Sequence, residues 1–328
     1  MIGIRFIFAF IASFFISYFG NFLLILMSDG KKFMDLPNRR KIHNGNIPRS
    51  GGIALFLSII IPTIIAGGIS PLIFIASFMV FLLGLVDDAI NLDFRSKFTV
   101  QFIAATLCVV DGVKIEKLAT SFGSLDLGFA GLVLTYLWII GMTNAINLID
   151  GLDGLAISTV LFSSAFLSFT LNNPLIPLVI VGASFGFLIH NFNPAKIFMG
   201  DSGSMFLGFF MSIVVLKYFT DLDGTWIVGM GVFMGYPVLD TTYAFFRRLH
   251  ERRNPFLPDR KHFHHQLLEK GFSQKGVLFR LILLSVIFNF LGLSLRRVDS
   301  VLLFLYVFIS GIFYIHVKGL PFKTERRF

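Results

Sequence analysis

The sequence has few charged residues and a single cysteine. Only 14% of its 328 residues are charged, whereas soluble domains carry roughly 25%, and this difference argues against a soluble globular protein. Cys108 has no second cysteine to pair with, which excludes a disulfide framework and a cysteine-based metal site. Short repeats and low-complexity tracts are also missing, and no polar segment is long enough to fold alone.

Apolar residues dominate what remains. The chain is 55% hydrophobic with 42 phenylalanines, and its mean hydropathy is +0.80. A bilayer core of about 30 Å needs about 20 apolar residues per helical span. The sequence therefore predicts one all-α domain over residues 1–328, a polytopic membrane protein with about eleven transmembrane helices. The expected spans are 2–27, 53–69, 72–86, 99–110, 128–146, 155–171, 174–190, 204–219, 225–246, 277–294 and 300–317.

The distribution of lysine and arginine predicts the orientation. Cytoplasmic loops collect these residues, and most of the 28 in this chain fall on one side of the expected spans. The N-terminus is therefore expected outside and the C-terminus in the cytoplasm. On the outer side, residues 111–127 are expected to form either a short hairpin or a surface helix. The net charge of +9 follows from the same bias and from attraction to anionic lipid.

Five polar segments interrupt the apolar sequence, all on the predicted cytoplasmic side. They lie in loops at 28–52, 87–98, 144–154, 191–204 and 247–276, and they read DLPNRRKIHNGNIPRSGG, DDAINLDFRSK, NAINLIDGLDG, NPAKIFMGDSGS and RRNPFLPDRKHFHH. Connecting loops do not need so many carboxylates, histidines and glycines. Their convergence on one face indicates a single active site for a charged, phosphorylated substrate.

The acidic pair Asp87 and Asp88 follows an apolar helix. Adjacent carboxylates at a membrane boundary repel each other and need a cation, a proton or a basic partner. They suit Mg²⁺, which prefers oxygen ligands and often binds through substrate phosphates. The alternative is a pair of solvated loop acids. Arg95 and Lys97 follow closely and are candidates for holding an anionic head group.

The third segment places Asn144, Asn147, Asp150 and Asp153 at spacings of three. They share one face if the helix continues, although the following glycines indicate that it breaks there. This cluster of donors and acceptors suits a nucleotide base or a phosphate. The alternative is a helix-capping loop, for which Asn, Asp and Gly are typical.

The fourth segment, GDSGS, opens the expected span at 204–219. Backbone N–H groups at a helix start attract phosphate, and Asp201 would be a metal ligand aimed at the same place. A plain N-cap is the alternative.

The fifth segment carries His262, His264 and His265 among basic residues. Zinc lacks support because no HExxH motif or partner cysteine is present. A cationic, hydrogen-bonding cradle for a pyrophosphate is favoured, with a basic loop that holds incidental histidines as the alternative. Asp240 lies near the inner end of its expected span, where an ionisable group is either functional or a structural hydrogen-bonding residue.

Taken in order, the runs DLPNRRKIHNGNIPRSGG, GLVDDAINL, NAINLIDGLDGLA, FMGDSGSMFLG and PDRKHFHH resemble the motifs of the polyprenyl-phosphate N-acetylhexosamine-1-phosphate transferases (glycosyltransferase family 4). The resemblance covers residues 20–275. The HFHH run, in which Phe263 interrupts the histidines, looks more like the WecA-type branch than the phospho-MurNAc-pentapeptide translocase branch.

The resemblance implies a reaction and its cofactor. GlcNAc-1-phosphate would pass from UDP-GlcNAc to undecaprenyl phosphate, giving undecaprenyl-pyrophosphoryl-GlcNAc and UMP, the first membrane step of a cell-envelope polysaccharide such as lipopolysaccharide O-antigen. Mg²⁺, or alternatively Mn²⁺, would be held by Asp201, Asp87 and Asp88. Asp87 would act as a base, a metal ligand or both.

It also implies roles for the remaining residues. Asp150 and Asp153, with Asn147, would hold the nucleotide, while Asp35 and Asn38 would contribute to substrate binding. Arg95 and Lys97 would meet the lipid phosphate, and the histidines at 262, 264 and 265 would grip the diphosphate or the sugar.

The expected partners are a UDP-N-acetylhexosamine, undecaprenyl phosphate and membrane lipid, with no nucleic acid; a homodimer would suit the architecture. The expected location is the bacterial inner membrane, as a multi-pass protein with its active site facing the cytoplasm. One alternative is the same chemistry with another UDP-N-acetylhexosamine. A transporter would instead place ionisable groups at the midplane, and an aspartate-rich prenyltransferase would not need the GDSGS and HFHH segments.

Overall fold

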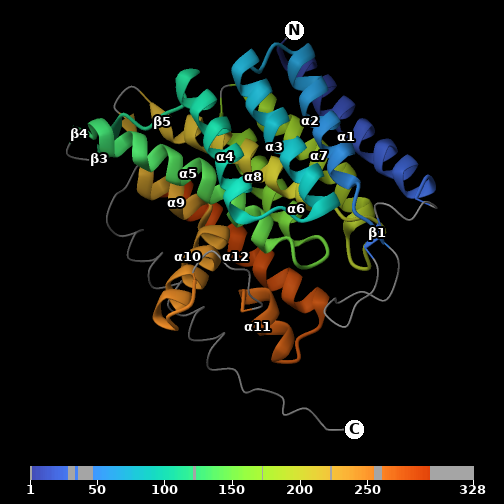
Figure 1. Ribbon diagram of the computed structural model, residues 1–328. Coiled ribbons are helices and arrows are strands. Elements are labelled where there is room, and N and C mark those ends of the chain that lie inside the picture. The colour runs from blue at the N-terminus through green and yellow to red at the C-terminus, as the bar shows by residue number, and fades with distance from the viewer. Residues whose placement is uncertain are drawn as a thin grey trace.

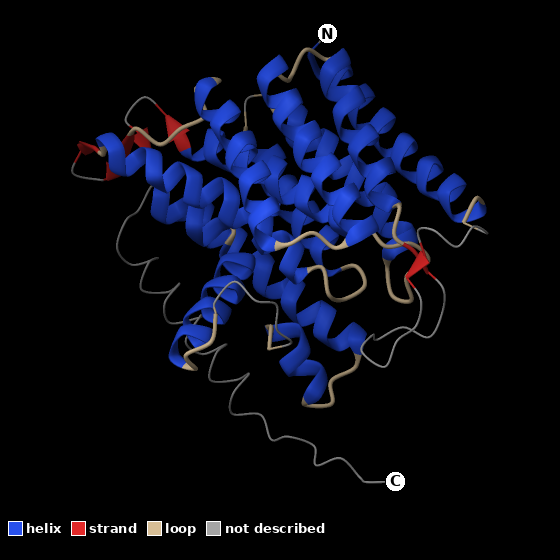
Figure 2. Ribbon diagram, viewed as in Figure 1, coloured by secondary structure: helices blue, strands red, loops and turns tan. Residues whose placement is uncertain are grey.

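The computed structural model describes residues 2–28, 34–35, 47–120, 123–171, 173–221, 224–254 and 261–295. Helices make up most of this part of the chain (Figures 1 and 2), as the all-α prediction requires. They are α1 Ile2–Leu26, α2 Gly51–Ile65, α3 Pro71–Ile90, α4 Phe94–Val110, α5 Gly128–Ile149, α6 Leu155–Thr170, α7 Leu175–Asn191, α8 Gly200–Phe219, α9 Ile227–Phe233, α10 Gly235–His250, α11 Phe263–Glu269 and α12 Gln274–Leu295.

Five of the described helices are long and apolar enough to cross a membrane, namely α1, α3, α5, α8 and α12. Helices α2, α6 and α7 are apolar but shorter. The chain is therefore a helical membrane protein, while the count of about eleven spans and the orientation of the termini remain predictions. The expected span at 300–317 lies outside the described residues.

Helix α8 is the centre of the bundle (Figure 1). It packs against α2, α3 and α5, and nearly all of its residues are buried. Helix α1 lies at the edge and exposes an apolar face that includes Phe8, Phe15 and Phe19, as expected of a surface in contact with lipid. The buried α8 begins with the GDSGS segment, so that segment lies inside the protein and not in a surface loop.

The single span expected at 225–246 is wrong, because the chain breaks into α9 and α10 at Met234. Pro237 has no N–H to offer the carbonyl of Phe233 four residues earlier. The side-chain amide of Asn289 on α12 donates to that carbonyl instead, at 2.7 Å. A side chain at Gly235 would collide with the ring of Phe288, 2.6 Å from its Cβ position. Helix α10 therefore leaves the bundle in a new direction, on the side where α11 lies (Figure 1).

Two small sheets complete the described fold. Strands β1 Met34–Asp35 and β2 Ile47–Pro48 pair antiparallel. Strands β3 Lys117–Thr120, β4 Gly123–Asp126, β5 Thr220–Asp221 and β6 Gly224–Thr225 form a second sheet in the order β4-β3-β6-β5. The segment 111–127 thus contains the hairpin and not the surface helix. This sheet precedes α5 and follows α8, at the end of both helices opposite the polar segments.

Candidate active site

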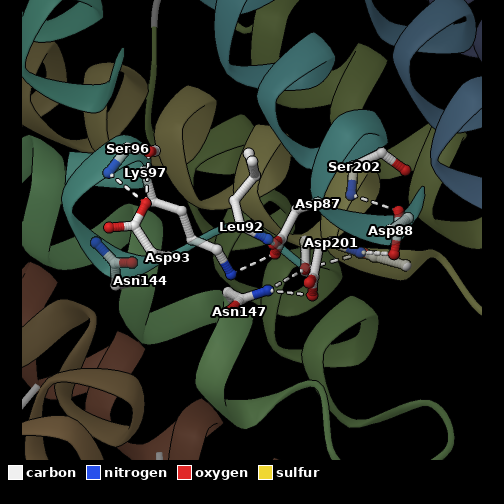
Figure 3. Close-up of polar contacts among 12 residues, drawn as sticks. Asp87, Asp88, Leu92, Asp93, Ser96, Lys97, Asn144, Asn147, Asp201 and Ser202 are labelled. Carbon is white, nitrogen blue, oxygen red and sulfur yellow. Dashed lines mark hydrogen bonds and ion pairs between the residues drawn. The ribbon is translucent and has the colours of Figure 1, made fainter. Parts of the chain in front are cut away.

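Asp87 lies in the last turn of α3 and is buried. Asn91 ends this helix with a left-handed backbone, φ 52°, which turns the chain so that the N–H of Leu92 donates to Asp87 Oδ1 at 2.7 Å. The ammonium of Lys97, in the first turn of α4, forms an ion pair with Asp87 Oδ2 (Figure 3). The charge of Asp87 is therefore met by a cation and a backbone dipole, which rules out a solvated loop acid.

Asp88 binds the start of α8. Its Oδ1 accepts the N–H of Asp201 at 2.9 Å, and its Oδ2 accepts the N–H of Ser202 at 3.0 Å (Figure 3). A carboxylate at this place satisfies two otherwise unpaired donors and interacts favourably with the helix dipole. The sequence analysis expected the N–H groups at this helix start to bind a phosphate. Two of them, those of Asp201 and Ser202, instead donate to Asp88.

Glycines allow the helices to meet closely around this contact. A Cβ at Gly52 on α2 would lie 2.4 Å from the nitrogen of Gly203, and one at Gly84 on α3 would lie 2.4 Å from Ser202 Cα. Real side chains do not tolerate such distances, so only glycine fits. The backbone of Gly51 and Gly52 also donates to the carbonyls of Phe198 and Met199. The second part of the first polar segment is thereby joined to the fourth.

Asp201 lies in the first turn of α8 and faces Asp87. The two carboxyl groups lie beside each other and interact (Figure 3). Asn147 on α5 donates its amide to Asp201 Oδ1 at 2.9 Å and to Ser204 Oγ at 2.8 Å. Asp87, Asn147 and Asp201 therefore come from three helices to a single point, as the sequence predicted.

Helix α5 ends at Ile149. Of the two alternatives for the third polar segment, a continuing helix or a break near its glycines, the structure shows the break. Asp150 follows, half-buried, and its pKa is raised well above the usual range by burial and then by the negative charge of Asp201; the charge of Arg49 opposes this rise. Asp153 instead ties two loops together, because its Oδ2 accepts the amide of Asn193 at 3.0 Å and the N–H of Ala195 at 3.1 Å.

The three histidines lie beside this segment. The ring of His264 is buried against Gly151, where an added Cβ would approach Nε2 to 2.4 Å. Its ring centre lies 6.1 Å from that of His262 and 4.1 Å from that of His265. Burial, followed by the nearby His265 and His262, lowers the pKa of His264 well below its usual range. His264 is therefore neutral near pH 7, and His265 is the half-exposed member of this histidine row.

Not every predicted residue joins the site. Arg95 is exposed and lies over the ring of Phe94, 5.8 Å from its centre. Asp35 is described only as part of β1, and Asn38 lies outside the described residues. Arg49, which the sequence offered only as one of many basic residues, acts on the carboxyl of Asp150. Its position two residues before a helix that starts with two glycines was the available signal.

A divalent cation suits two of the three proposed ligands. Among the described residues, no group of three or more His, Cys, Asp or Glu side chains could hold a metal ion. Asp88 is turned toward the backbone at the start of α8, whereas Asp87 and Asp201 face each other. Two facing carboxylates repel each other unless a cation or proton lies between them. Mg²⁺ often binds one or two carboxylates together with phosphate oxygens and waters, so the residues present fit that ion.

The fold and the site define a helical membrane protein that gathers carboxylates, an amide and histidines at one end of its bundle. The family model described as glycosyl transferase family 4 matches residues 70–219. The chain is 36% identical over 294 residues to a Bacillus subtilis protein named probable undecaprenyl-phosphate N-acetylglucosaminyl 1-phosphate transferase, covering 85% of this chain and 82% of that one. It belongs to this family of polyprenyl-phosphate N-acetylhexosamine-1-phosphate transferases.

Two further relatives support the same assignment. A Thermotoga maritima protein named undecaprenyl-phosphate alpha-N-acetylglucosaminyl 1-phosphate transferase is 34% identical and covers 90% of this chain and 92% of its own. A Mycobacterium tuberculosis protein named decaprenyl-phosphate N-acetylglucosaminephosphotransferase is 31% identical and covers 80% of this chain and 76% of its own. The resemblance drawn from the five motifs is confirmed.

Proposed function

We propose that this protein transfers GlcNAc-1-phosphate from UDP-GlcNAc to undecaprenyl phosphate in a bacterial membrane, releasing UMP. The observation that carries the proposal is the meeting of Asp87, Asp201 and Asn147 at the end of the bundle, in a chain whose relatives bear the name of this activity. Facing carboxylates backed by Lys97 suit a reaction in which phosphate charge must be neutralised.

The acceptor would reach the site from the side of the bundle. An apolar groove of about 300 Å³ lies between α5 and the α9–α10 break, lined by residues that include Trp138, Gly141, Ala145, Met230 and Val238. Ala145 lies two residues before Asn147 on α5. A prenyl chain in this groove would bring its phosphate to the membrane boundary near the carboxylates, and the chemistry of the lining suits an apolar chain.

The chemistry is in-line phosphoryl transfer. An oxygen of the lipid phosphate attacks the β-phosphorus of the donor, and the bond from that phosphorus to the bridging oxygen breaks, so that UMP leaves with that oxygen. Such transfers depend on positioning and on charge neutralisation. Mg²⁺ held by Asp87 and Asp201 would neutralise the charge of the diphosphate. Lys97 supplies a further positive charge beside Asp87.

The nucleotide is assigned to the 150–154 loop. Asp150 faces the site and keeps its proton to a higher pH than an ordinary carboxyl, so it can donate a hydrogen bond to a neutral base or a sugar. Asp153 holds this loop in place by accepting hydrogen bonds from the amide of Asn193 and the N–H of Ala195. His265, the half-exposed histidine of the row, is the one best placed to reach the diphosphate. The cytoplasmic orientation of this end follows from the lysine and arginine distribution.

Release of UMP by the purified protein tests the proposal. In detergent with UDP-GlcNAc, undecaprenyl phosphate and Mg²⁺, we expect UMP release that requires both the lipid and the metal. Asp201→Ala and Asp201→Asn should abolish it while the protein still elutes as a folded species. If folded wild-type protein releases no UMP from UDP-GlcNAc but does so from another UDP-N-acetylhexosamine, the donor is corrected. No release from any of them would refute the transferase assignment.

A further inference from the structure

Asp240 is a fully buried carboxylate on α10 that the catalytic steps above do not use. Its Oδ2 lies 2.7 Å from Nδ1 of His262, and its Oδ1 accepts the N–H of Phe263 at 2.8 Å. Both partners belong to the segment that begins α11, which is distant from Asp240 in the chain. One side chain therefore joins α10 to the segment that carries the histidine row.

With Asp240 ionised, the contact sets the tautomer of His262. An ionised carboxylate only accepts hydrogen bonds, and the N–H of Phe263 already donates to one of its oxygens. Nδ1 of His262 must therefore carry the proton in the contact with Oδ2. A carboxylate at one ring nitrogen sets the tautomer and the orientation of the imidazole. His262 is buried in this position, so it acts as a support for its neighbours.

The contact extends toward the nucleotide loop. The ring of His262 is nearly parallel to that of His264, with an interplanar angle of 11°, and His264 lies against Gly151. His264 in turn neighbours His265. The N–H of Phe263 is in the first turn of α11, so Asp240 also caps this helix. The direction of α10 is itself fixed by the contact of Asn289 with Phe233.

We propose that Asp240 is a positioning residue for the phosphosugar transfer: through His262 and the N–H of Phe263 it holds the histidine row against the 150–154 loop, with His265 toward the substrate. The proposal rests on the proposed function. It assigns Asp240 no contact with substrate. Removal of the group that orients a metal-binding histidine commonly costs about 10- to 100-fold in activity or affinity, and we expect a loss of the same order for this buried pair.

A second contact between the same two segments provides a matched control. Glu251 follows α10, and its Oε1 accepts from the ammonium of Lys261 at 2.9 Å, directly before His262. Both side chains of this ion pair are partly exposed, and such surface pairs contribute little. Glu251→Gln therefore removes the same charge and another tether of the same loop, without touching a histidine.

The experiment compares Asp240→Asn, Asp240→Glu and Glu251→Gln in the full-length protein in detergent. Asp240→Asn is expected to lower kcat/KM for UDP-GlcNAc by about 10-fold or more, and to speed amide hydrogen exchange in residues 261–269. Asp240→Glu should recover part of the rate, and Glu251→Gln should match the wild type. Adding His262→Gln to Asp240→Asn should cause little further loss of kcat/KM, because both changes break the same contact between Asp240 and His262.

The outcomes separate this proposal from the assignment of the reaction. An inactive wild type would contradict the transferase function, while hydrogen exchange would still report whether Asp240 holds the loop. An active wild type with Asp240→Asn equal to Glu251→Gln in both rate and exchange would overturn the positioning role. Independent, additive losses in the double variant would also overturn it.

Discussion

Two adjacent aspartates at the end of α3 have different surroundings. Asp87 turns inward to Lys97 and Asp201, whereas both oxygens of Asp88 accept backbone N–H groups of α8. The sequence placed both residues in the expected site as metal ligands and gave Asp87 alone a possible role as a base, but it did not foresee that Asp88 binds backbone. The difference depends on which way each side chain faces from the helix, and the partner is more than a hundred positions away in the chain.

Asp88→Ala should therefore act through α8 and not through substrate. Loss of an N-terminal cap typically costs about 0.5–2 kcal/mol, and the displaced start of α8 carries Asp201. We expect a lower melting temperature together with a large loss of turnover. Ser70→Ala is the control, because Ser70 caps the other end of α3 through the N–H of Ile73. Ser70→Ala should lower stability but keep the turnover of the folded protein. Full activity in Asp88→Ala would show that the contact of Asp88 with the start of α8 is not needed to place Asp201.

His264 gives a dependence of stability on pH. Its pKa in the folded protein lies well below the ordinary value of 6.5. Just below pH 6.5 the imidazole is therefore protonated in the unfolded chain but still neutral in the folded protein. Stability should therefore fall as the pH decreases below 6.5, by up to about 1.4 kcal/mol per pH unit. Melting temperatures in detergent from about pH 7.5 to pH 5.5 would measure it. His264→Gln should flatten the decline, and an unchanged slope would exclude His264 as its source.

At the scale of elements, hydrophobic runs predicted most helices because apolar length decides what can span a bilayer. The same criterion concealed the break between α9 and α10, since the residues on both sides are apolar. Gly235 and Pro237 were the local signals of the break. Asn289, which satisfies the released carbonyl of Phe233, could not be inferred, because only packing brings α12 beside this break.

The break can be tested with a double-variant cycle on Asn289 and Pro237. Asn289→Leu leaves the carbonyl of Phe233 buried without a partner, at a cost of about 1–3 kcal/mol. In a Pro237→Ala background, the new N–H can donate to that carbonyl, so Asn289→Leu should cost less. Thermal unfolding of the four proteins measures both costs. Equal costs in the two backgrounds would show that the carbonyl of Phe233 does not depend on Asn289.

At the scale of the whole molecule, the two substrates would approach from different directions. The lipid would enter sideways between α5 and α9–α10, and the nucleotide would enter at the end of the bundle. A side chain at Gly141 would meet open space within this groove. Gly141→Leu should therefore raise KM for undecaprenyl phosphate several-fold and leave KM for UDP-GlcNAc unchanged.

Gly3→Leu is the matched control for this substitution. Gly3 also borders open space, but it lies on α1, away from the groove, so both KM values should stay the same. Equal increases of the two KM values in Gly141→Leu would point to a general distortion of the site. No change in either value would place the prenyl chain elsewhere.

The residue types that gather at the candidate site could be predicted from the sequence, but the partner that each side chain contacts could not. Motif order pointed to Asp87, Asn147 and Asp201, which the structure brings together, because a cluster of polar groups in an apolar chain has few explanations other than function. Contacts between distant segments decided the rest, such as Asp153 holding the loop of Asn193 and Ala195. Arg95 has the expected charge, yet its described contact is with the ring of Phe94.

The central position of α8 has a consequence for how the protein is made. Its buried start receives Asp88 and Asn147 from segments that leave the ribosome earlier, so the carboxylate cluster can assemble soon after α8 is inserted. The histidine row is translated later and depends on α10 for its place. A nascent chain can thus acquire its carboxylates while it still lacks the segment of residues 261–269 that completes this end of the bundle.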